Sequence, residues 1–317
     1  MLRQRVSDEL GLPLDLVNGI GRSASHRYFS YRIPKRVGGG FREIHHPARE
    51  LKVLQRWLVA EVISRLPVHE AAAAYRRGKG IGDHARLHVR NSFLLRMDFR
   101  HFFPSLTVTD VKNLIGRHRN LFTDWDGGDL AWFGSVVSRE NRLTIGAPTS
   151  PGLSNTLCFD LDTRLSNLAF ERGVTYSRYA DDLFFSTSEP DVLRLVEEDT
   201  KGIVSSLELP SRLVLNDEKT VHASRKRRRV VTGIVLTSDG RLSVGRDRKR
   251  ALRTMVHRYP ELTTKEKRHL AGMLAYVRSV EPNFIDRLVL KYGSERVEEI
   301  FSCMAWTLAE TDEGDGD

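Results

Sequence analysis

The sequence predicts a protein of the α+β class, and three observations carry this expectation. Residues 174–188 place short runs of strand-forming residues on both sides of two adjacent acids, which is typical of a β-hairpin. Residues 48–66 and 153–168 carry apolar side chains at three- and four-residue spacing, as helices packed on a core do. From Val244 on, the chain is basic and has a helical pattern. We therefore expect a mixed region of strands and helices, followed by a basic helical module.

The composition is that of a globular protein with a polyanionic partner. The chain has 317 residues, of which 40% are hydrophobic and 29% charged, enough for two or three subdomains around a sizeable core. Its net charge is +9, and its last ten residues hold five acids and no base, so the rest carries +14. This balance suits nucleic acid. Acidic lipid would suit it equally, but no basic amphipathic helix favours that partner.

The ends of the chain and its cysteines point to the cytoplasm. The first residues lack the apolar core of about 7–15 residues that a signal peptide needs. No apolar run reaches the roughly 18 residues of a membrane span, so we expect no membrane association. Cys158 and Cys303 are too few for a disulfide framework or a four-cysteine metal site. Each is expected to be a small buried side chain in a reducing compartment.

A small helical lead over residues 1–30 is expected to precede a basic hairpin. In residues 30–47, two strands flank the glycine-rich tip at 35–40, and glycine permits such a tight reversal. Lys35 and Arg42 flank this tip. They could grip a triphosphate, or they could be ordinary exposed charges of a hairpin.

The next segments predict a core helix and then a basic stretch. The helix covers residues 48–66 and is expected to stop at Pro67. Residues 71–91 are basic and contain Tyr75, so they could follow a phosphate backbone with one aromatic side chain for stacking. The basic residues concerned are Arg76, Arg77, Lys79, Arg86 and Arg90.

A long helix is expected to lead into the hairpin of the two acids. Ser150 can cap it, Pro151 suits its first turn, and Gly173 can end it. Its apolar stripe is interpreted as core and consists of Leu153, Leu157, Leu161, Leu165 and Leu168. Trp125 and Trp132, in the polar stretch before this helix, are also expected to be core.

Three acids are the strongest functional signal. Asp181 and Asp182 lie at the tip of the predicted hairpin, and Asp98 ends another apolar run. Adjacent acids alone are usually a solvated turn. Acids from separate strands that converge on one point are what a two-metal phosphoryl-transfer site needs, and Mg²⁺ prefers such oxygen ligands.

The remaining segments predict a helix at 191–207, then a short strand and turn over 213–220 that ends at Lys219. Residues 224–229 are a dense basic run, which is either a solvated loop or a binding surface. A strand over 230–237 is expected to contain Gly233. In the helical module that follows, Leu270, Leu274 and Val277 form an apolar face.

These motifs resemble the reverse transcriptases, and among them the bacterial retron type, over Tyr31 to Gly293. RYADDLFFS resembles the catalytic hairpin, MDFRHFFPSL the segment of the first catalytic acid, and GAPTSPGLSN the motif before the palm helix. The resemblance implies a right-hand polymerase fold with fingers, palm and helical thumb. The expected boundaries are an N-terminal lead and fingers at 1–90, a palm at 91–237 with a finger segment at about 107–150, a thumb at 238–309 and a disordered acidic tail at 310–317.

The resemblance also implies residue roles. Asp98, Asp181 and Asp182, with the backbone carbonyl of Phe99, would hold two Mg²⁺ ions, and Lys219 would give a proton to the leaving pyrophosphate. The residues implied to contact the incoming dNTP are Lys35, Arg42, Phe103, Ile145 and Gly146, with Phe103 as the gate against the ribose 2′-OH. Ile145 stands where most relatives have Gln, so nucleotide affinity or accuracy is expected to be unusual.

Two short elements resemble retron enzymes in particular. HARLH at 84–88 is similar to their Asn-Ala-x-x-His element, with His84 in the place of Asn, and VTG at 231–233 matches their Val-Thr-Gly element. LAGMLAYVRSV also resembles the thumb helix of retron and group II intron enzymes. The residues expected to bind RNA are His84, His88, Arg227, Arg228, Val231, Thr232 and Gly233.

The resemblance implies an RNA-directed DNA polymerase that copies its own structured noncoding RNA from a 2′-OH primer. The product would be branched, RNA-linked msDNA, and a separate effector protein would act with it in anti-phage defence. Two alternatives remain: another bacterial reverse transcriptase that copies external templates, and a non-catalytic RNA-binding scaffold. A scaffold has no physical need for three clustered acids in a basic protein.

Overall fold

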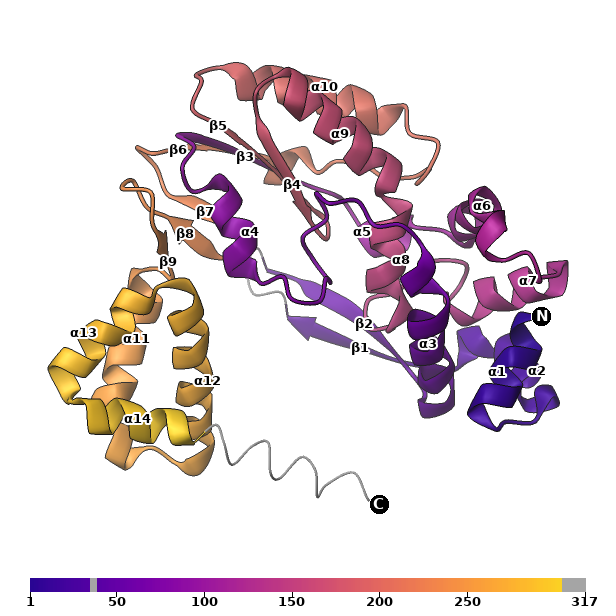
Figure 1. Cartoon of the computed structure of the whole chain (residues 1–317), viewed down its shortest axis with the longest axis horizontal. Coiled ribbons are helices and arrows are strands. Elements are labelled where there is room, and N and C mark those ends of the chain that lie inside the picture. The colour runs from indigo at the N-terminus through magenta and orange to yellow at the C-terminus, as the bar shows by residue number, and fades with distance from the viewer. Residues whose placement is uncertain (35–38, 304–317) are drawn as a thin grey trace. The chain divides into compact units, whose positions relative to one another are not determined.

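A computed structural model describes residues 1–34 and 39–303, which divide into two units (Figure 1). The first unit contains Met1–Lys79 and Phe93–His222, and the second contains Gly80–Ser92 and the residues from Ala223 on. This division does not test the predicted boundaries of fingers, palm and thumb, which remain predictions. Lys35 and the acidic tail lie outside the described residues. Among the described residues, no helix is long and apolar enough to cross a membrane.

The first unit opens with the expected helical lead. Helices α1 (Leu2–Leu10) and α2 (Leu14–Arg22) are followed by the 3₁₀ turn η1 (Ala24–His26). Trp132 packs so closely on α2 that a Cβ atom at Gly21 would lie 2.2 Å from the indole ring. Trp132 and Trp125 are both buried, which confirms their assignment to the core.

The predicted basic hairpin is present as strands β1 (Tyr28–Pro34) and β2 (Phe41–Pro47). They pair antiparallel, from Tyr28 opposite Pro47 to Pro34 opposite Phe41.

The core helix after this hairpin is shorter than predicted. Helix α3 (Arg49–Glu61) ends at Glu61 rather than before Pro67, and the 3₁₀ turn η2 (Ile63–Arg65) follows it. The break falls at Val62, whose φ of −119° departs from the roughly −63° of a regular α-helix, and a β-branched pair at 62–63 lowers helix propensity. The apolar stripe stays buried across the break, because the tighter turn keeps it facing the core.

The acids lie on a sheet of strands in the order β4-β5-β3-β6, in which the β4–β5 and β5–β3 pairs are antiparallel. These strands are β3 (Phe93–Asp98), β4 (Thr175–Tyr179), β5 (Asp182–Thr187) and β6 (Val221–Ser224). Leu183, Phe184 and Phe185 follow one another on β5 and are all fully buried, so the sheet is covered on both faces. Residues 213–220 form no strand: Leu215 makes one isolated bridge with Phe99, and the 3₁₀ turn η4 (Asp217–Lys219) follows.

The predicted long helix is two helices, α8 (Thr149–Leu157) and α9 (Phe159–Glu171), which break at Cys158. Ser150 does not cap α8, because it lies inside the helix and its Oγ accepts a hydrogen bond from the Thr144 amide at 3.2 Å. The leucine stripe is buried as predicted, since it crosses the break without changing face. Helix α9 packs on β4 and on α10 (Val192–Ser205).

The other helices of the first unit are short. They are α5 (Phe102–Ser105), α6 (Val108–Arg117), the 3₁₀ turn η3 (Arg119–Leu121) and α7 (Gly127–Val136).

The second unit combines a small sheet with a helical module. Helix α4 (Ile81–His88) packs on the antiparallel sheet β7-β8-β9, whose strands are Arg229–Val231, Ile234–Leu236 and Leu242–Ser243. The single strand predicted over 230–237 is in fact a hairpin, because Thr232 and Gly233 have φ values of 47° and 81° and reverse the chain.

The helical module contains α11 (Arg246–His257), the 3₁₀ turn η5 (Tyr259–Glu261), α12 (Thr264–Val280), α13 (Pro282–Tyr292) and α14 (Ser294–Ser302). Its predicted apolar face on α12 is buried. Cys158 is buried as expected, but Cys303 is only half-buried, and its sulfur lies 3.2 Å from the Tyr259 hydroxyl.

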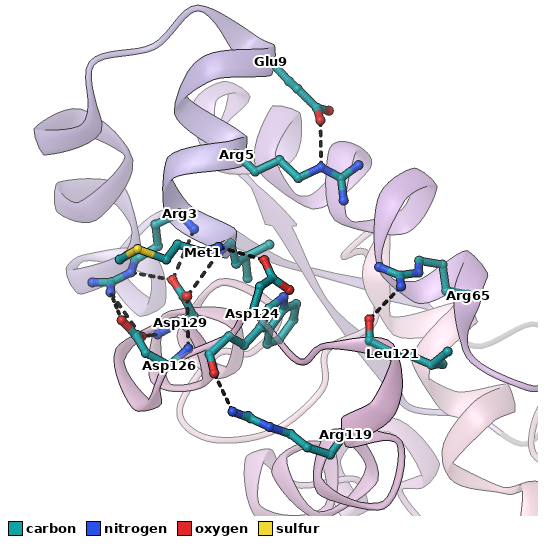
Figure 2. A network of polar contacts seen from close by, with 12 residues as sticks. Met1, Arg3, Arg5, Glu9, Arg65, Arg119, Leu121, Asp124, Asp126 and Asp129 are labelled. Atoms are coloured by element: carbon teal, nitrogen blue, oxygen red, sulfur yellow. Dashed lines mark hydrogen bonds and ion pairs between the residues drawn. The ribbon is translucent and has the colours of Figure 1, made fainter.

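Asp129 fastens the N-terminal helix to α7 (Figure 2). Its buried carboxylate accepts hydrogen bonds from the amides of Leu2 and Arg3, and from Arg3 Nε at 2.8 Å. Burial, the largest single influence on this group, raises the pKa of Asp129. The bonds from Arg3 and the backbone outweigh it, so the pKa of Asp129 lies below its ordinary value.

We expect Asp129→Asn to lower the free energy of unfolding at pH 7 by about 1–3 kcal/mol, because it removes charge-assisted hydrogen bonds. A carboxylate with a lowered folded-state pKa stabilises above its unfolded pKa of about 3.9, and this contribution fades as pH falls through the folded value. Urea unfolding at pH 7 and pH 3 measures both effects. A stability difference that stays constant between the two pH values would contradict this role of the charge.

Candidate active site

The two adjacent acids lie at a tight hairpin between β4 and β5. Tyr179 and Asp182 are the last paired residues, so the loop consists of Ala180 and Asp181 alone. Ala180 has a φ of 56°, in the left-handed region that a non-glycine residue enters only at a cost. Asp181 therefore lies at the tip, and Asp182 is the first residue of β5.

The third acid comes from the neighbouring strand. Asp98 is the last residue of β3, and it pairs with Asp182 in the antiparallel register. The Phe99 amide donates a hydrogen bond to the Asp181 carbonyl oxygen at 3.2 Å. The sheet therefore brings three acids together at the ends of adjacent strands, as the sequence predicted.

Two basic side chains lie near these acids. Lys219 Nζ lies 2.9 Å from Asp98 Oδ1, and the turn that carries Lys219 is fixed by a 2.8 Å hydrogen bond from the Asn216 amide to the Asp98 carbonyl. Arg96 Nε lies 3.9 Å from Asp182 Oδ1. One acid thus has a close ion-pair partner and another has a more distant one.

The pKa values of Asp181 and Asp182 show that the neighbouring basic side chains do not balance the negative charge of the acids. Burial, and then repulsion from Asp181, raises the pKa of Asp182 to about 7. The pKa of Asp181 is also raised, by burial first and by the nearby Asp98. No three His, Cys, Asp or Glu side chains within 1–34 and 39–303 form a ready-made metal-binding group. The residues nevertheless fit divalent cations, because crowded carboxylate oxygens are hard ligands and a cation would relieve their repulsion.

Three of the predicted dNTP contacts lie close to these acids or to the first hairpin. Arg42, exposed on β2, is near enough to act against the rise in the Asp181 pKa. Ile145 accepts a hydrogen bond through its carbonyl from the His45 amide at 2.8 Å, and a Cβ atom at Gly146 would lie 2.7 Å from the His45 carbonyl oxygen. Residues 145–146 therefore lie directly on β2.

Phe103 follows Phe102 in the chain but is less buried than Phe102. It is half-buried on α5, and its ring packs edge-on against Phe102 with 5.4 Å between centroids. A half-buried aromatic ring held by a buried one is suited to a steric role.

The predicted RNA-binding residues all belong to the second unit. His84 and His88 on α4 are buried there, with ring centroids 5.7 Å apart, and burial lowers the pKa of His84 to about 4 and that of His88 to about 3. Both rings are therefore neutral interior groups at pH 7.

The other members of this set surround the β7–β8 hairpin. Arg227 and Arg228 are exposed just before β7, Val231 is buried, and Thr232 and Gly233 form the turn. The exposed charges and the turn are accessible to a partner, in contrast to the two histidine rings.

Sequence reasoning missed a buried polar group beneath the acid-bearing hairpin. Arg178 on β4 and Asp162 on α9 form an ion pair in which both side chains have no exposed surface. Tyr176 and Asn155 complete the group. The sequence offered little signal for this pair, because Asp162 is one of several polar residues in FDLDTRLSNLAFE and Arg178 follows a serine in TYSRY.

Comparison with known proteins identifies the family of the chain. The family described as reverse transcriptase (RNA-dependent DNA polymerase) matches residues 33–236. The retron Ec83 reverse transcriptase of Escherichia coli is 35% identical over 88% of this chain and 91% of that protein. The retron Ec86 reverse transcriptase of the same organism is 30% identical over 86% of this chain and 84% of that protein. A solved telomerase from Candida albicans is 15% identical, with a TM-score of 0.49 over 88% of this chain and 56% of that one.

The chain belongs to the reverse transcriptase family, and within it to the retron reverse transcriptases. It is an RNA-directed DNA polymerase, and family membership confirms the expected right-hand polymerase fold of the α+β class. Reverse transcriptases in general depend on divalent metal ions, which agrees with the crowding of acids described above.

Asp182→Asn is expected to stabilise the metal-free protein at pH 8, by an amount on the order of 1–3 kcal/mol. Asp182 has a raised folded-state pKa, so the parent takes up a proton on folding and loses stability as pH rises from about 4 to about 7. The variant lacks this loss. Urea unfolding in a chelator from pH 4 to pH 8 measures it, and equal pH dependence in both proteins would contradict the assignment.

Proposed function

We propose that this protein is the polymerase of a retron, which copies its own structured noncoding RNA into DNA that remains linked to that RNA. The observation that carries the proposal is the meeting of Asp98, Asp181 and Asp182 at the ends of neighbouring strands, in a chain of the retron family. A basic hairpin beside the acids and a second basic surface in the other unit supply the charge that RNA and dNTPs need.

The positions of the residues support the roles that we propose for them. Asp98, Asp181, Asp182 and the Phe99 carbonyl would hold two Mg²⁺ ions, which, when bound, supply acidity to the primer hydroxyl and charge neutralisation to the triphosphate. Lys219 is half-exposed next to Asp98 and would donate a proton to the leaving pyrophosphate. Arg42, together with Lys35, would bind the triphosphate of the incoming dNTP.

Recognition of the cognate RNA is assigned to the second unit. Arg227 and Arg228 would contact phosphates, and the β7–β8 turn at Thr232 and the exposed Gly233 would contact the RNA. Because their rings are interior, His84 and His88 would act by shaping α4 and the sheet beneath this surface. The branched msDNA, a 2′-OH primer in the RNA, a separate effector and a role in anti-phage defence belong to this proposal, as does a cytoplasmic location.

The alternatives differ in what accompanies the protein. A reverse transcriptase without a dedicated RNA would copy an added primer and template, and would carry no defined nucleic acid. A non-catalytic scaffold would carry RNA alone. The crowded acids argue for catalysis, because their repulsion costs stability at pH 8 that bound divalent cations would return.

We expect Asp181→Ala to abolish DNA synthesis and to leave RNA binding nearly unchanged, since Asp181 belongs to the first unit and the proposed RNA contacts belong to the second. Parent and variant are expressed with the native flanking DNA, and the copurified nucleic acid is treated with DNase or RNase. The parent should carry a DNase-sensitive species joined to RNA, and the variant RNA alone. RNA alone in both would favour the scaffold, and synthesis by the variant would contradict the site.

Phe103→Ala is expected to admit ribonucleotides, because the proposed discrimination is steric and depends on ring volume. The ratio of kcat/KM for dNTP to that for rNTP should fall by about 10-fold or more. Single-nucleotide extension of one primer with both substrates measures this ratio. Phe102→Leu, in the adjacent buried ring, is the matched control and should keep the discrimination of the parent. Equal ratios in the parent and Phe103→Ala would remove the gate role.

A further inference from the structure

The buried ion pair beneath the acid-bearing hairpin is geometrically complete. Arg178 Nε donates to Asp162 Oδ1 at 2.8 Å, and Arg178 Nη2 donates to Asp162 Oδ2 at 2.6 Å. This two-bond arrangement fixes the plane of the guanidinium group. The remaining nitrogen, Nη1, is thereby aimed in one direction.

Arg178 Nη1 points at the turn that carries Asp181. It donates a hydrogen bond to the Ala180 carbonyl oxygen at 3.1 Å. The carbonyl of Ala180 belongs to the peptide unit that leads into Asp181, so this bond fixes the orientation of that peptide. On its other side, the Asp181 carbonyl accepts from the Phe99 amide at 3.2 Å. The backbone on both sides of the Asp181 side chain is therefore held.

The turn needs such support because of its conformation. Ala180 has a φ of 56°, and an alanine in this region is strained where a glycine would not be. A strained residue persists only when its surroundings over-determine it. The hydrogen bond from Arg178, on the strand that leads into this turn, is a contact of this kind.

Further contacts hold the ion pair itself. The Tyr176 hydroxyl donates to Asp162 Oδ1 at 2.8 Å, and Asn155 Oδ1 accepts from Arg178 Nη1 at 3.3 Å. Asn155 Nδ2 in turn donates to the Ala74 carbonyl at 2.8 Å. Both amide and carbonyl of Arg178 also bond to the backbone of residues 71–73. Side chains from α8 and α9 thus bond to the guanidinium of Arg178, and residues 71–73 bond to its backbone.

Stability alone gives a poor reason for this pair. Two charges removed entirely from water pay a desolvation penalty that apolar residues of similar size would avoid. Two of the guanidinium's bonds orient the group, and its third nitrogen bonds to the carbonyl next to a catalytic acid. This placement favours a role in positioning that acid over a role in stability.

We propose that Arg178, oriented by Asp162, is a positioning residue that fixes the Asp181 carboxylate for divalent-cation binding. The proposal rests on the proposed function, in which Asp181 is a metal ligand. Loss of the pair should therefore weaken cation binding and slow the chemical step, and should leave dNTP recognition by the first hairpin largely unchanged.

The test uses Arg178→Lys, which keeps the charge but cannot hold Asp162 with two bonds and reach Ala180 as well. The full-length protein is bound to an RNA template and a dideoxy-terminated DNA primer with the next dNTP, so that no reaction occurs. Electron paramagnetic resonance of free Mn²⁺ then reports cation binding, and a primer with a free 3′-OH gives kcat and KM. Tyr176→Phe is a milder second variant, because it removes only one hydrogen bond to Asp162.

Leu168→Ala is the matched control for lost stability, since it opens a cavity on the same helix two turns from Asp162. Thermal unfolding of every variant is measured, and assays are run below the transition. We expect Arg178→Lys to weaken Mn²⁺ binding and lower kcat by about 10–100-fold, as loss of a residue that orients a ligand does, with KM for dNTP nearly unchanged. Tyr176→Phe should shift Mn²⁺ affinity less, in the same direction, and Leu168→Ala should not shift it.

Parental Mn²⁺ affinity and kcat in a folded Arg178→Lys variant would overturn the proposal, and so would an equal shift in Leu168→Ala. Should Arg178→Lys not fold, Tyr176→Phe decides: a weakened affinity supports the positioning role, and an unchanged one overturns it. Failure of the proposed function has a different signature. The parent would then bind Mn²⁺ but synthesise no DNA, while the difference between parent and variants in Mn²⁺ binding would remain.

Discussion

Repulsion among three carboxylates is the constraint on which the rest of the first unit depends. Asp98, Asp181 and Asp182 are held close together in a partly buried place, where charges of one sign cost free energy. A flexible loop would relax and separate them. The antiparallel sheet prevents this, because its backbone hydrogen bonds fix two of the acids opposite each other and the third one residue away.

The support of the sheet explains why so much of the core lies beneath it. Three consecutive side chains of β5 are fully buried. Helix α9 packs on β4, and α10 packs on β3 and β5. This packing stabilises the folded state and offsets the repulsion among the acids. The buried Arg178–Asp162 pair belongs to the same support, since its charges compensate each other and its free donor reaches the turn.

Position 145 shows how a contact can be independent of the side chain. The backbone carbonyl of Ile145 accepts a hydrogen bond from the His45 amide of β2. That contact does not depend on the side chain. Gly146 then lies so close to the same strand that no Cβ atom would fit without movement. The contact between residues 145–146 and the first hairpin is thus maintained by the backbone, while the side chain at 145 is free to differ.

The sequence by itself determined the hairpin strands around Asp181 and Asp182, the strand that ends at Asp98, the apolar stripes and the family, because these depend on local pattern and on short motifs. It could not place the helix breaks at Val62 and Cys158, since the apolar spacing continues through both. It also read one strand where Thr232 and Gly233 make a turn, because a β-branched residue at positive φ contradicts local preference. Only the tertiary structure showed that His84 and His88 are interior, and that Arg178 and Asp162 meet. Burial and pairing between distant segments depend on how helices and strands pack, which residue spacing along one segment does not encode.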